Sequence, residues 1–359
     1  MDFEQLLADL SQGRTAALAR AISMVENARP GFEQLLAAVH SRLGRAQRIG
    51  ITGPPGAGKS TLTLQLVRAC RSRGLTVAVV AVDPTSPFSG GALLGDRIRM
   101  EAVALDPGVY IRSMATRGSL GGLATSTREV CDVLDAGGFD RIIIETVGVG
   151  QSELAVTSMA DSTVLVLVPE SGDGIQTLKS GLMEAADLYV VNKADRPGAD
   201  SLARELEVTL GIRQGNAFRG MKAHHGINLG KAARKAAKSS AGPTDPVAGP
   251  SDAATPPTWD PPVLLTIAPK GEGVDQLVVA LDRHYAWMAE HGELLARRTR
   301  RLAARTREVV DRAMQRWIWG ETRAEELLRE RIDEVALGRL SPYDLAAEIV
   351  AGLKEGARV

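Results

Sequence analysis

Short apolar runs alternate along the chain with segments whose apolar residues recur every three or four positions. Seven runs, each four to six residues long and rich in Val, Ile and Leu, have the length of strands. They span residues 49–52, 77–82, 109–112, 141–145, 164–168, 188–191 and 263–267. Because these runs are apolar at consecutive positions, both faces of each strand should be buried. The pattern predicts an α/β fold with a mostly parallel central sheet covered by helices.

Helical periodicity dominates both ends of the chain. Residues 3–44 predict two or three helices, broken at Gly13 and at Pro30-Gly31. Beyond Gly271, four helical segments span residues 274–287, 294–319, 324–337 and 343–353. We therefore expect an N-terminal helical extension over residues 1–45, a sheet domain over 46–291 and a C-terminal helical region over 292–359.

The stretch at residues 239–258 differs in composition from the rest of the chain. It is rich in Pro, Ala, Ser, Thr and Asp and carries little apolar surface to offset the entropy of ordering it. We predict a flexible surface loop there.

Charge and cysteine usage narrow the class of protein. Lys plus Arg and Asp plus Glu both number 43, so the formal net charge is zero and nothing calls for nucleic acid or an acidic membrane as a partner. The two cysteines, Cys70 and Cys131, do not have the spacing of a zinc knuckle or a disulfide framework. No apolar run approaches the roughly 20 residues of a membrane span, and the N-terminus is acidic where a targeting signal would be basic. We expect a cytoplasmic protein.

The first predicted strand leads into a glycine-rich turn with the pattern G-x-x-x-x-G-K-[ST]. The turn and the start of the next helix read Gly53-Pro54-Pro55-Gly56-Ala57-Gly58-Lys59-Ser60-Thr61. Its glycines allow backbone N–H groups to point inward around an anion, and the helix N-terminus adds partial positive charge. Lys59 is expected to reach the β- and γ-phosphates of a nucleotide, and Ser60 to bind Mg²⁺. The motif in this context predicts a P-loop nucleotide-binding fold.

A second motif selects the base. Asn192-Lys193-Ala194-Asp195 directly follows the sixth predicted strand, where N-K-x-D lies in GTP-binding domains. The Asp195 carboxylate can accept hydrogen bonds from N1–H and the 2-amino group of guanine, which adenine does not offer. The stem of Lys193 is expected to lie along the base. The predicted nucleotides are therefore GTP and GDP rather than ATP.

Carboxylates follow other strand ends. Glu145-Thr146-Val147-Gly148 ends the strand at 141–145, so Glu145 should meet the Mg²⁺ shell and the Gly148 N–H should sense the γ-phosphate. Asp83 and Asp96 lie after the strand at 77–82 and could join that shell, although each alone could also be a helix cap or a solvated turn residue.

No glutamine directly follows Gly148, as one does in Ras-type enzymes, so intrinsic GTP hydrolysis is expected to be slow. Gln151 is the candidate for positioning the attacking water.

Four stretches, at residues 19–27, 83–100, 117–122 and 145–153, indicate one particular family of GTPases. Together they resemble the MeaB/ArgK family, the GTPase chaperones of adenosylcobalamin-dependent methylmalonyl-CoA mutase within the SIMIBI class of P-loop GTPases. The resemblance implies a helical extension, a GTPase domain and a C-terminal arm for homodimerisation. It also implies a protein that gates cofactor loading into the mutase and protects the mutase, with the mutase's adenosyltransferase as a further candidate partner.

Residue by residue, the resemblance assigns Lys59 and Ser60 to phosphate and Mg²⁺, and Asp83, Asp96 and Glu145 to the metal site and switches. A third loop, at residues 169–179, corresponds to the family's mutase-contacting loop. The base-contacting loop departs from the family pattern Ser-Ala-x, because it reads Ile267-Ala268-Pro269 here. Only a backbone contact from Ala268 can be carried over.

Two other functions compete with this interpretation. A nickel or cobalt insertion GTPase would share the P-loop and the Glu-x-x-Gly strand, but such proteins usually carry a His-rich tail or a Cys-containing metal motif. A P-loop kinase of a small metabolite would select adenine, which the motif at 192–195 disfavours.

Overall fold

The computed structural model describes residues 3–83, 100–115, 120–146, 152–171, 180–213 and 258–356. The chain divides into two compact units, Met1–Gly292 and Glu293–Val359. The predicted flexible loop, apart from Thr258, lies outside the described residues.

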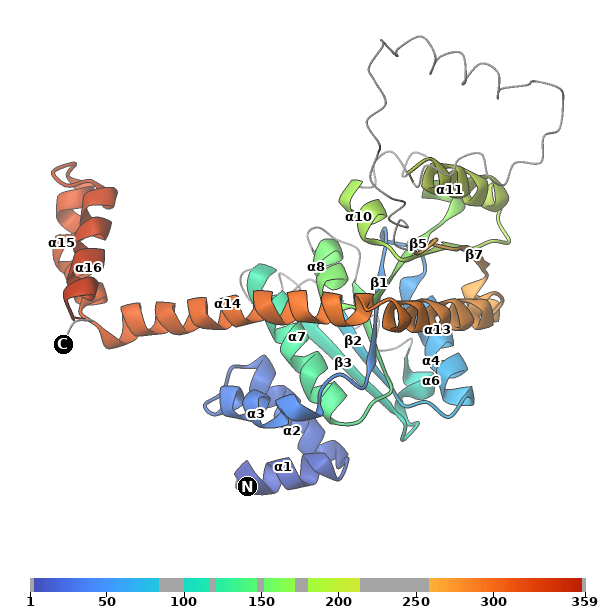
Figure 1. The fold of residues 1–359 in the computed structure, drawn as a ribbon, viewed down its shortest axis with the longest axis horizontal. Coiled ribbons are helices and arrows are strands. Elements are labelled where there is room, and N and C mark those ends of the chain that lie inside the picture. The colour runs from blue at the N-terminus through green and yellow to red at the C-terminus, as the bar shows by residue number, and fades with distance from the viewer. Residues whose placement is uncertain are drawn as a thin grey trace, which may run out of the picture. The chain divides into compact units, whose positions relative to one another are not determined.

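The first unit is built on a sheet in which every pair of neighbouring strands is parallel (Figure 1). Its strands are β1 (Gln47–Thr52), β2 (Val77–Asp83), β3 (Val109–Ala115), β4 (Arg141–Thr146), β5 (Ser162–Leu167), β6 (Leu188–Asn192) and β7 (Val263–Thr266). They lie in the order β3-β2-β4-β1-β5-β6-β7. The predicted parallel α/β fold is confirmed, and each of the seven apolar runs forms a strand of this sheet.

One face of the sheet is covered by the N-terminal helices and by four later ones. These are α1 (Phe3–Ser11), α2 (Thr15–Glu26), α3 (Phe32–Val39), α7 (Leu120–Ala136), α8 (Ser152–Met159), α10 (Ser180–Ala185) and α11 (Ala199–Arg213), with a 3₁₀ turn η1 (His40–Arg42). Leu18 and Ile22 of α2 share a core with Val130 and Leu134 of α7, so the N-terminal helices are an integral part of this unit. That core buries the apolar side chains that helical periodicity placed on one face of each helix.

The opposite face is covered by α4 (Lys59–Ser72), α6 (Glu101–Ala104) and α13 (Val274–Glu290) (Figure 1). Leu62 and Leu66 of α4 pack with Leu277 and Leu281 of α13 against this side of the sheet. Two 3₁₀ turns, η2 (Pro169–Ser171) and η3 (Ala268–Lys270), follow β5 and β7. The result is a three-layer arrangement with the strands buried on both sides.

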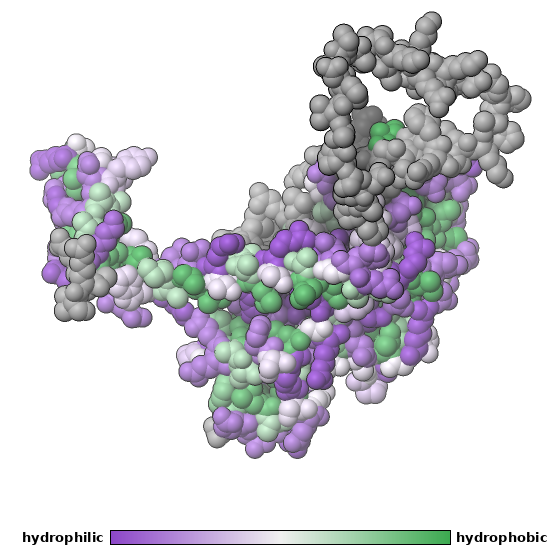
Figure 2. All heavy atoms as spheres, in the orientation of Figure 1, coloured by the Kyte–Doolittle hydropathy of each residue, from purple (hydrophilic) through white to green (hydrophobic). Residues whose placement is uncertain are grey.

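The second unit consists of α14 (Glu293–Glu321), α15 (Ala324–Ala336) and α16 (Pro342–Gly356). Its small core is formed by Ala324, Leu345 and Ile349. Within the described chain, no residue of α14 is buried. Figure 2 shows hydrophobic side chains exposed along this helix among hydrophilic ones. None of the described helices is both long enough and apolar enough to cross a bilayer.

Candidate functional site

The glycine-rich loop connects the end of β1 to the start of α4 and has the backbone conformation of an anion cradle. Gly53 has φ 139°, and a Cβ at this position would lie 2.1 Å from the Val166 carbonyl oxygen of β5. Gly58, the N-cap of α4, has φ 86°. Both conformations suit glycine alone, so the sequence motif and the shape of the loop require each other.

Lys59 is buried and bends back over this loop. Its Nζ donates to the carbonyl oxygens of Gly53 at 2.8 Å and Pro54 at 3.0 Å. The ammonium group is thereby held against the glycine-rich loop. Phosphate oxygens carry negative charge, and they would be stronger acceptors for this ammonium than backbone carbonyls.

Ser60 and Glu145 meet beneath the cradle. The Ser60 Oγ donates to Glu145 Oε1 at 2.6 Å, although 85 residues separate them in the chain. They meet because β1 and β4 are neighbours, with Ile51 paired to Glu145. Glu145 is 1% exposed, so its carboxylate lies in a buried position next to the Ser60 hydroxyl. A hydroxyl and a carboxylate are hard oxygen donors of the kind that Mg²⁺ prefers.

The motif predicted to select guanine begins at the end of β6. The Asn192 Nδ2 donates to the Ala57 carbonyl at 2.8 Å, and its Oδ1 accepts from the Thr266 hydroxyl and the Ala268 N–H, both at 3.1 Å. Asn192 therefore joins the P-loop to the loop after β7. Lys193 has φ 57°, an uncommon conformation for a residue with a side chain, and Asp195 is exposed.

The hydrogen bonds of Asn192 also involve Ala268, whose backbone was expected to contact the base. The residue is fully buried, and its N–H already donates to Asn192. The direct contact between this N–H and a base stays a prediction.

Other predicted site residues are placed only in part. Asp83 is the last residue of β2, and its side chain is not among those described. Asp96, Gly148 and Gln151 lie outside the described residues, as does most of the loop at 169–179. Their predicted roles stay predictions.

The sequence interpretation overlooked Thr266. Its hydroxyl contacts Asn192 because β6 and β7 pair Asn192 with Thr266. The position directly before Ile267-Ala268 was a clue, but the register of the two strands is needed to turn it into a contact.

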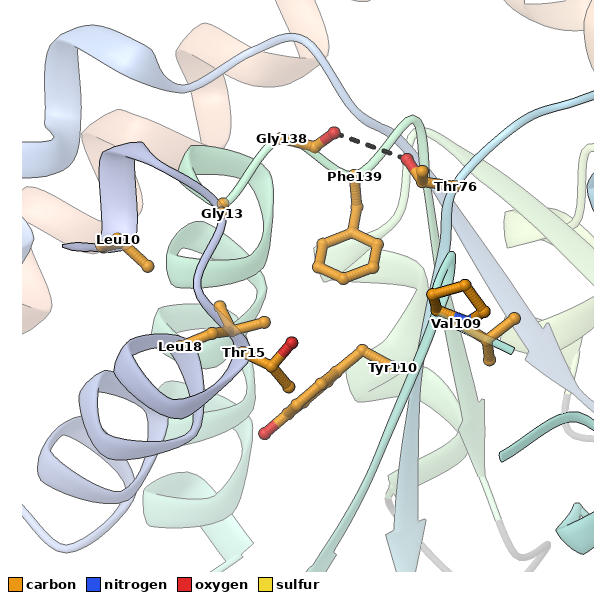
Figure 3. A pocket seen from close by; sticks show the side chains of 11 residues that line it. Leu10, Gly13, Thr15, Leu18, Thr76, Val109, Tyr110, Gly138 and Phe139 are labelled. Carbon is orange, nitrogen blue, oxygen red and sulfur yellow. Dashed lines mark hydrogen bonds between the residues drawn. The ribbon is translucent and has the colours of Figure 1, made fainter. Parts of the chain in front are cut away.

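A cavity of about 150 Å³ lies near the amino-terminal ends of β2, β3 and β4, away from the glycine-rich loop (Figure 3). Leu10 and Leu18 from the N-terminal helices line it together with Val109, Tyr110 and Phe139. Among the described residues, its lining includes no lysine, arginine or carboxylate, and burial raises the pKa of Tyr110. These walls do not suit a nucleoside triphosphate, because its phosphates need cationic side chains and N–H donors. The cradle is the better candidate site.

A comparison with family models decides the class of protein. The model described as methylmalonyl Co-A mutase-associated GTPase MeaB matches residues 18–323. This chain belongs to the MeaB family. Membership confirms the resemblance seen in the sequence, and it identifies the protein as a GTPase that binds guanine nucleotides.

Individual relatives agree with this family assignment. A protein of Pyrococcus abyssi that is named as a GTPase is 39% identical over 353 residues, which cover 97% of each chain. The GTPase ArgK of Escherichia coli is 44% identical over 190 residues, which cover 52% of this chain and 57% of ArgK. A crystal structure titled LAO/AO transport system kinase matches with a TM-score of 0.63 and 25% identity over 99% of each chain. The MeaB family fold therefore extends over the whole chain.

Proposed function

We propose that this GTPase gates the loading of adenosylcobalamin into methylmalonyl-CoA mutase, or a related acyl-CoA mutase, and protects the loaded enzyme. The family description, which names a mutase-associated GTPase, supports the partner. The observation that carries the nucleotide chemistry is the meeting of Ser60, Glu145 and Asn192 around one glycine-rich loop. Three separate strand ends thereby converge on the place where a nucleotide would lie.

We propose that Mg²⁺ binds between Ser60 and Glu145. The donor set fits this ion, because two oxygen ligands from the protein would leave other positions for phosphate and water. When bound, Mg²⁺ would neutralise charge on the β- and γ-phosphates. Asp83 and Asp96 complete the proposed metal site and switches, following the family resemblance.

The proposed work of the chain's own residues follows from their positions. Lys59 would exchange its two carbonyl partners for phosphate oxygens, and the N–H groups at the start of α4 would hold the same phosphates. Asp195, exposed after β6, would accept from guanine. Gln151 would position the attacking water, with turnover slow until a partner engages.

We further propose that loss of the γ-phosphate changes which carboxylates reach Mg²⁺. The segments at 83–96 and 145–153 would respond to this change, and residues 169–179 would transmit it to the mutase. An Asp96→Ala variant should then keep GTP affinity and lose stimulation of hydrolysis by the mutase. Undiminished stimulation, or complete loss of GTP binding, would contradict this switch.

We propose a homodimer formed through the second unit. Along α14, Leu295, Leu302 and Val309 recur every seven residues and are 72%, 45% and 36% exposed. Thr299, Thr306 and Ala313 lie between and beyond them, giving the alternating spacing of four and three that lines a coiled-coil seam. A second copy could bury this seam.

A Leu302→Glu variant should dissociate the dimer, because a charge in such a seam lacks a partner. Ala304→Glu places the same charge on the other side of α14 and should leave the dimer intact. Light scattering distinguishes the two variants. Deleting residues 293–359 should also give a monomer that still binds GTP.

The partner is tested by co-purification with methylmalonyl-CoA mutase in the presence of GTP, of GDP and of no nucleotide. We expect retention that depends on the nucleotide, together with faster GTP turnover at saturating mutase. The mutase's adenosyltransferase, added to the same mixture, tests the further partner. Absence of any effect of the mutase would contradict the proposal.

Two competing functions make different predictions in the same assays. A nickel or cobalt insertion GTPase would bind Ni²⁺ or Co²⁺ tightly in equilibrium dialysis and would ignore the mutase. A metabolite kinase would bind ATP at least as tightly as GTP.

A cytoplasmic location, with neither nucleic acid nor membrane as partner, also remains our proposal. It is supported by the balanced charge and by Cys70 and Cys131, which are both buried and remain as thiols.

A further inference from the structure

Thr266 ends β7 beside the strand that carries the guanine-selecting motif. It is 1% exposed and pairs in register with Asn192 of β6. Its backbone and its side chain both hold that motif: the Thr266 carbonyl accepts from the Ala194 N–H at 3.0 Å, and its hydroxyl donates to Asn192 Oδ1 at 3.1 Å.

The hydrogen bonds around Asn192 fix the orientation of its side-chain amide. The Ala57 carbonyl can only accept, so it must face Nδ2, and the Ala268 N–H can only donate, so it must face Oδ1. The Thr266 hydroxyl can do either, and beside Oδ1 it must donate. Both lone pairs of Oδ1 are then used, and Nδ2 retains a second N–H that can serve a ligand.

The amide also packs directly on the phosphate-binding loop. A Cβ at Gly58 would lie 2.4 Å from Asn192 Nδ2, closer than atoms can approach. A small rotation of the amide would therefore move it against the loop or away from Ala57. The loop that selects the base and the loop that holds the phosphates share this one side chain.

We propose that Thr266 is a positioning residue for nucleotide binding, because its hydroxyl locks the amide that couples the base loop to the phosphate cradle. The inference rests on the proposed nucleotide site. It predicts weaker binding of GTP and GDP alike, since both carry the base and the β-phosphate, and little change in the hydrolysis rate at saturating GTP.

The hydroxyl can be removed without disturbing the strand. Thr266→Val keeps the β-branched shape and the backbone pairing with β6. Thr266→Ser restores the hydroxyl, and Thr266→Ala repeats the test without new contacts should valine disturb the fold. Thr163→Val makes the same change near the amino-terminal end of β5, away from the cradle at the carboxyl ends of the strands, and is the matched control.

The affinities for GDP and GTP are measured by isothermal titration on the full chain. We expect Thr266→Val to bind both about tenfold more weakly, because one buried hydrogen bond to the amide is lost. Thr266→Ser and Thr163→Val should bind like the wild type, and kcat should stay unchanged while KM rises. In an Asn192→Ala background, removing the Thr266 hydroxyl should have no further effect.

Three outcomes overturn the inference: wild-type affinity in both Thr266→Val and Thr266→Ala, failure of serine to restore affinity, or an equal loss in the Asn192→Ala background. Failure of the wild-type protein itself to bind guanine nucleotides would instead contradict the proposed site.

Discussion

Two clusters of buried polar side chains lie at opposite ends of the parallel strands, and their side chains are paired in different ways. We call the two ends the carboxyl edge and the amino edge of the sheet. At the carboxyl edge, the cradle cluster consists of Lys59, Ser60 and Glu145, where a loop, a helix start and a strand end meet. At the amino edge, Ser162 Oγ and His284 Nδ1 lie 2.8 Å apart, and His284 Nε2 lies 3.4 Å from Asp187 Oδ1. We call this second group the amino-edge cluster.

The amino-edge cluster has the residue types of a hydrolytic triad without access for a substrate. Ser162 and His284 are both 0% exposed. The other carboxylate oxygen of Asp187 accepts from the Thr163 N–H at 2.9 Å, and the Asp187 carbonyl accepts from Trp259 Nε1 at 2.8 Å. This group links the start of β5, the residue before β6, the segment that leads into β7 and the helix α13, so it holds the sheet and this helix together. Residue types alone would not have separated the two clusters.

The largest expected effect distinguishes the clusters by stability. Asp187→Ala removes the acceptor for the buried Thr163 N–H and the carboxylate that lies beside His284 Nε2, and should lower the free energy of unfolding by about 3 kcal/mol. Nucleotide affinity of the folded fraction should not change. Denaturant unfolding and GDP titration measure the two quantities. Asp187→Asn, which can still accept from Thr163, should lose less, and a loss of GDP affinity in either variant would break the comparison.

A substitution in the cradle cluster should affect GTP turnover more than the stability of the fold. Lys59→Ala removes the cation expected to reach the phosphates, and GTP turnover should fall roughly 10²- to 10³-fold. The unfolding free energy without nucleotide should change less than in Asp187→Ala, because the Lys59 Nζ donates to two carbonyls of its own loop, Gly53 and Pro54, which lie close to it in the chain. Single-turnover kinetics and denaturant unfolding test this pair of expectations.

A smaller effect should separate base selection from phosphate binding. Asp195→Asn replaces an acceptor by an amide that also donates, so GTP affinity should fall and xanthosine triphosphate affinity should rise, each by roughly tenfold or more. Because Asp195 is exposed, stability should be unchanged. Titration with both nucleotides checks the result, and ATP binding as tight as GTP binding in the unmodified protein would refute this interpretation of the motif.

The smallest expected effect is a pH dependence of stability that arises from Asp106, a residue outside both clusters. Two hydrogen bonds from Arg71 and one from the Gly108 N–H hold the pKa of Asp106 below its ordinary value. A lowered pKa in the folded state means that this stabilisation is complete above the unfolded value and is lost as pH falls through the folded value. Thermal unfolding from about pH 5 to about pH 3 should show the wild type converging with Asp106→Asn. Parallel curves would contradict the expectation.

The comparison also indicates which features could be read from residues near one another in the chain. The strands at 77–82 and 141–145 were predictable because their apolar runs are continuous, and the P-loop was predictable because Gly53 and Gly58 impose its backbone. The helical segment at 294–319 became α14 nearly to the residue. These features depend on interactions within a few residues.

By itself, the sequence determined the parallel α/β fold, the glycine-rich cradle and the motif at 192–195, because period, turn chemistry and helix starts are local. Only the tertiary structure decided that β1 lies between β4 and β5, and hence that Glu145 reaches Ser60. It also decided that Thr266 lies beside Asn192. The order and register of parallel strands depend on how distant segments pack through crossover helices, and no local periodicity encodes that choice.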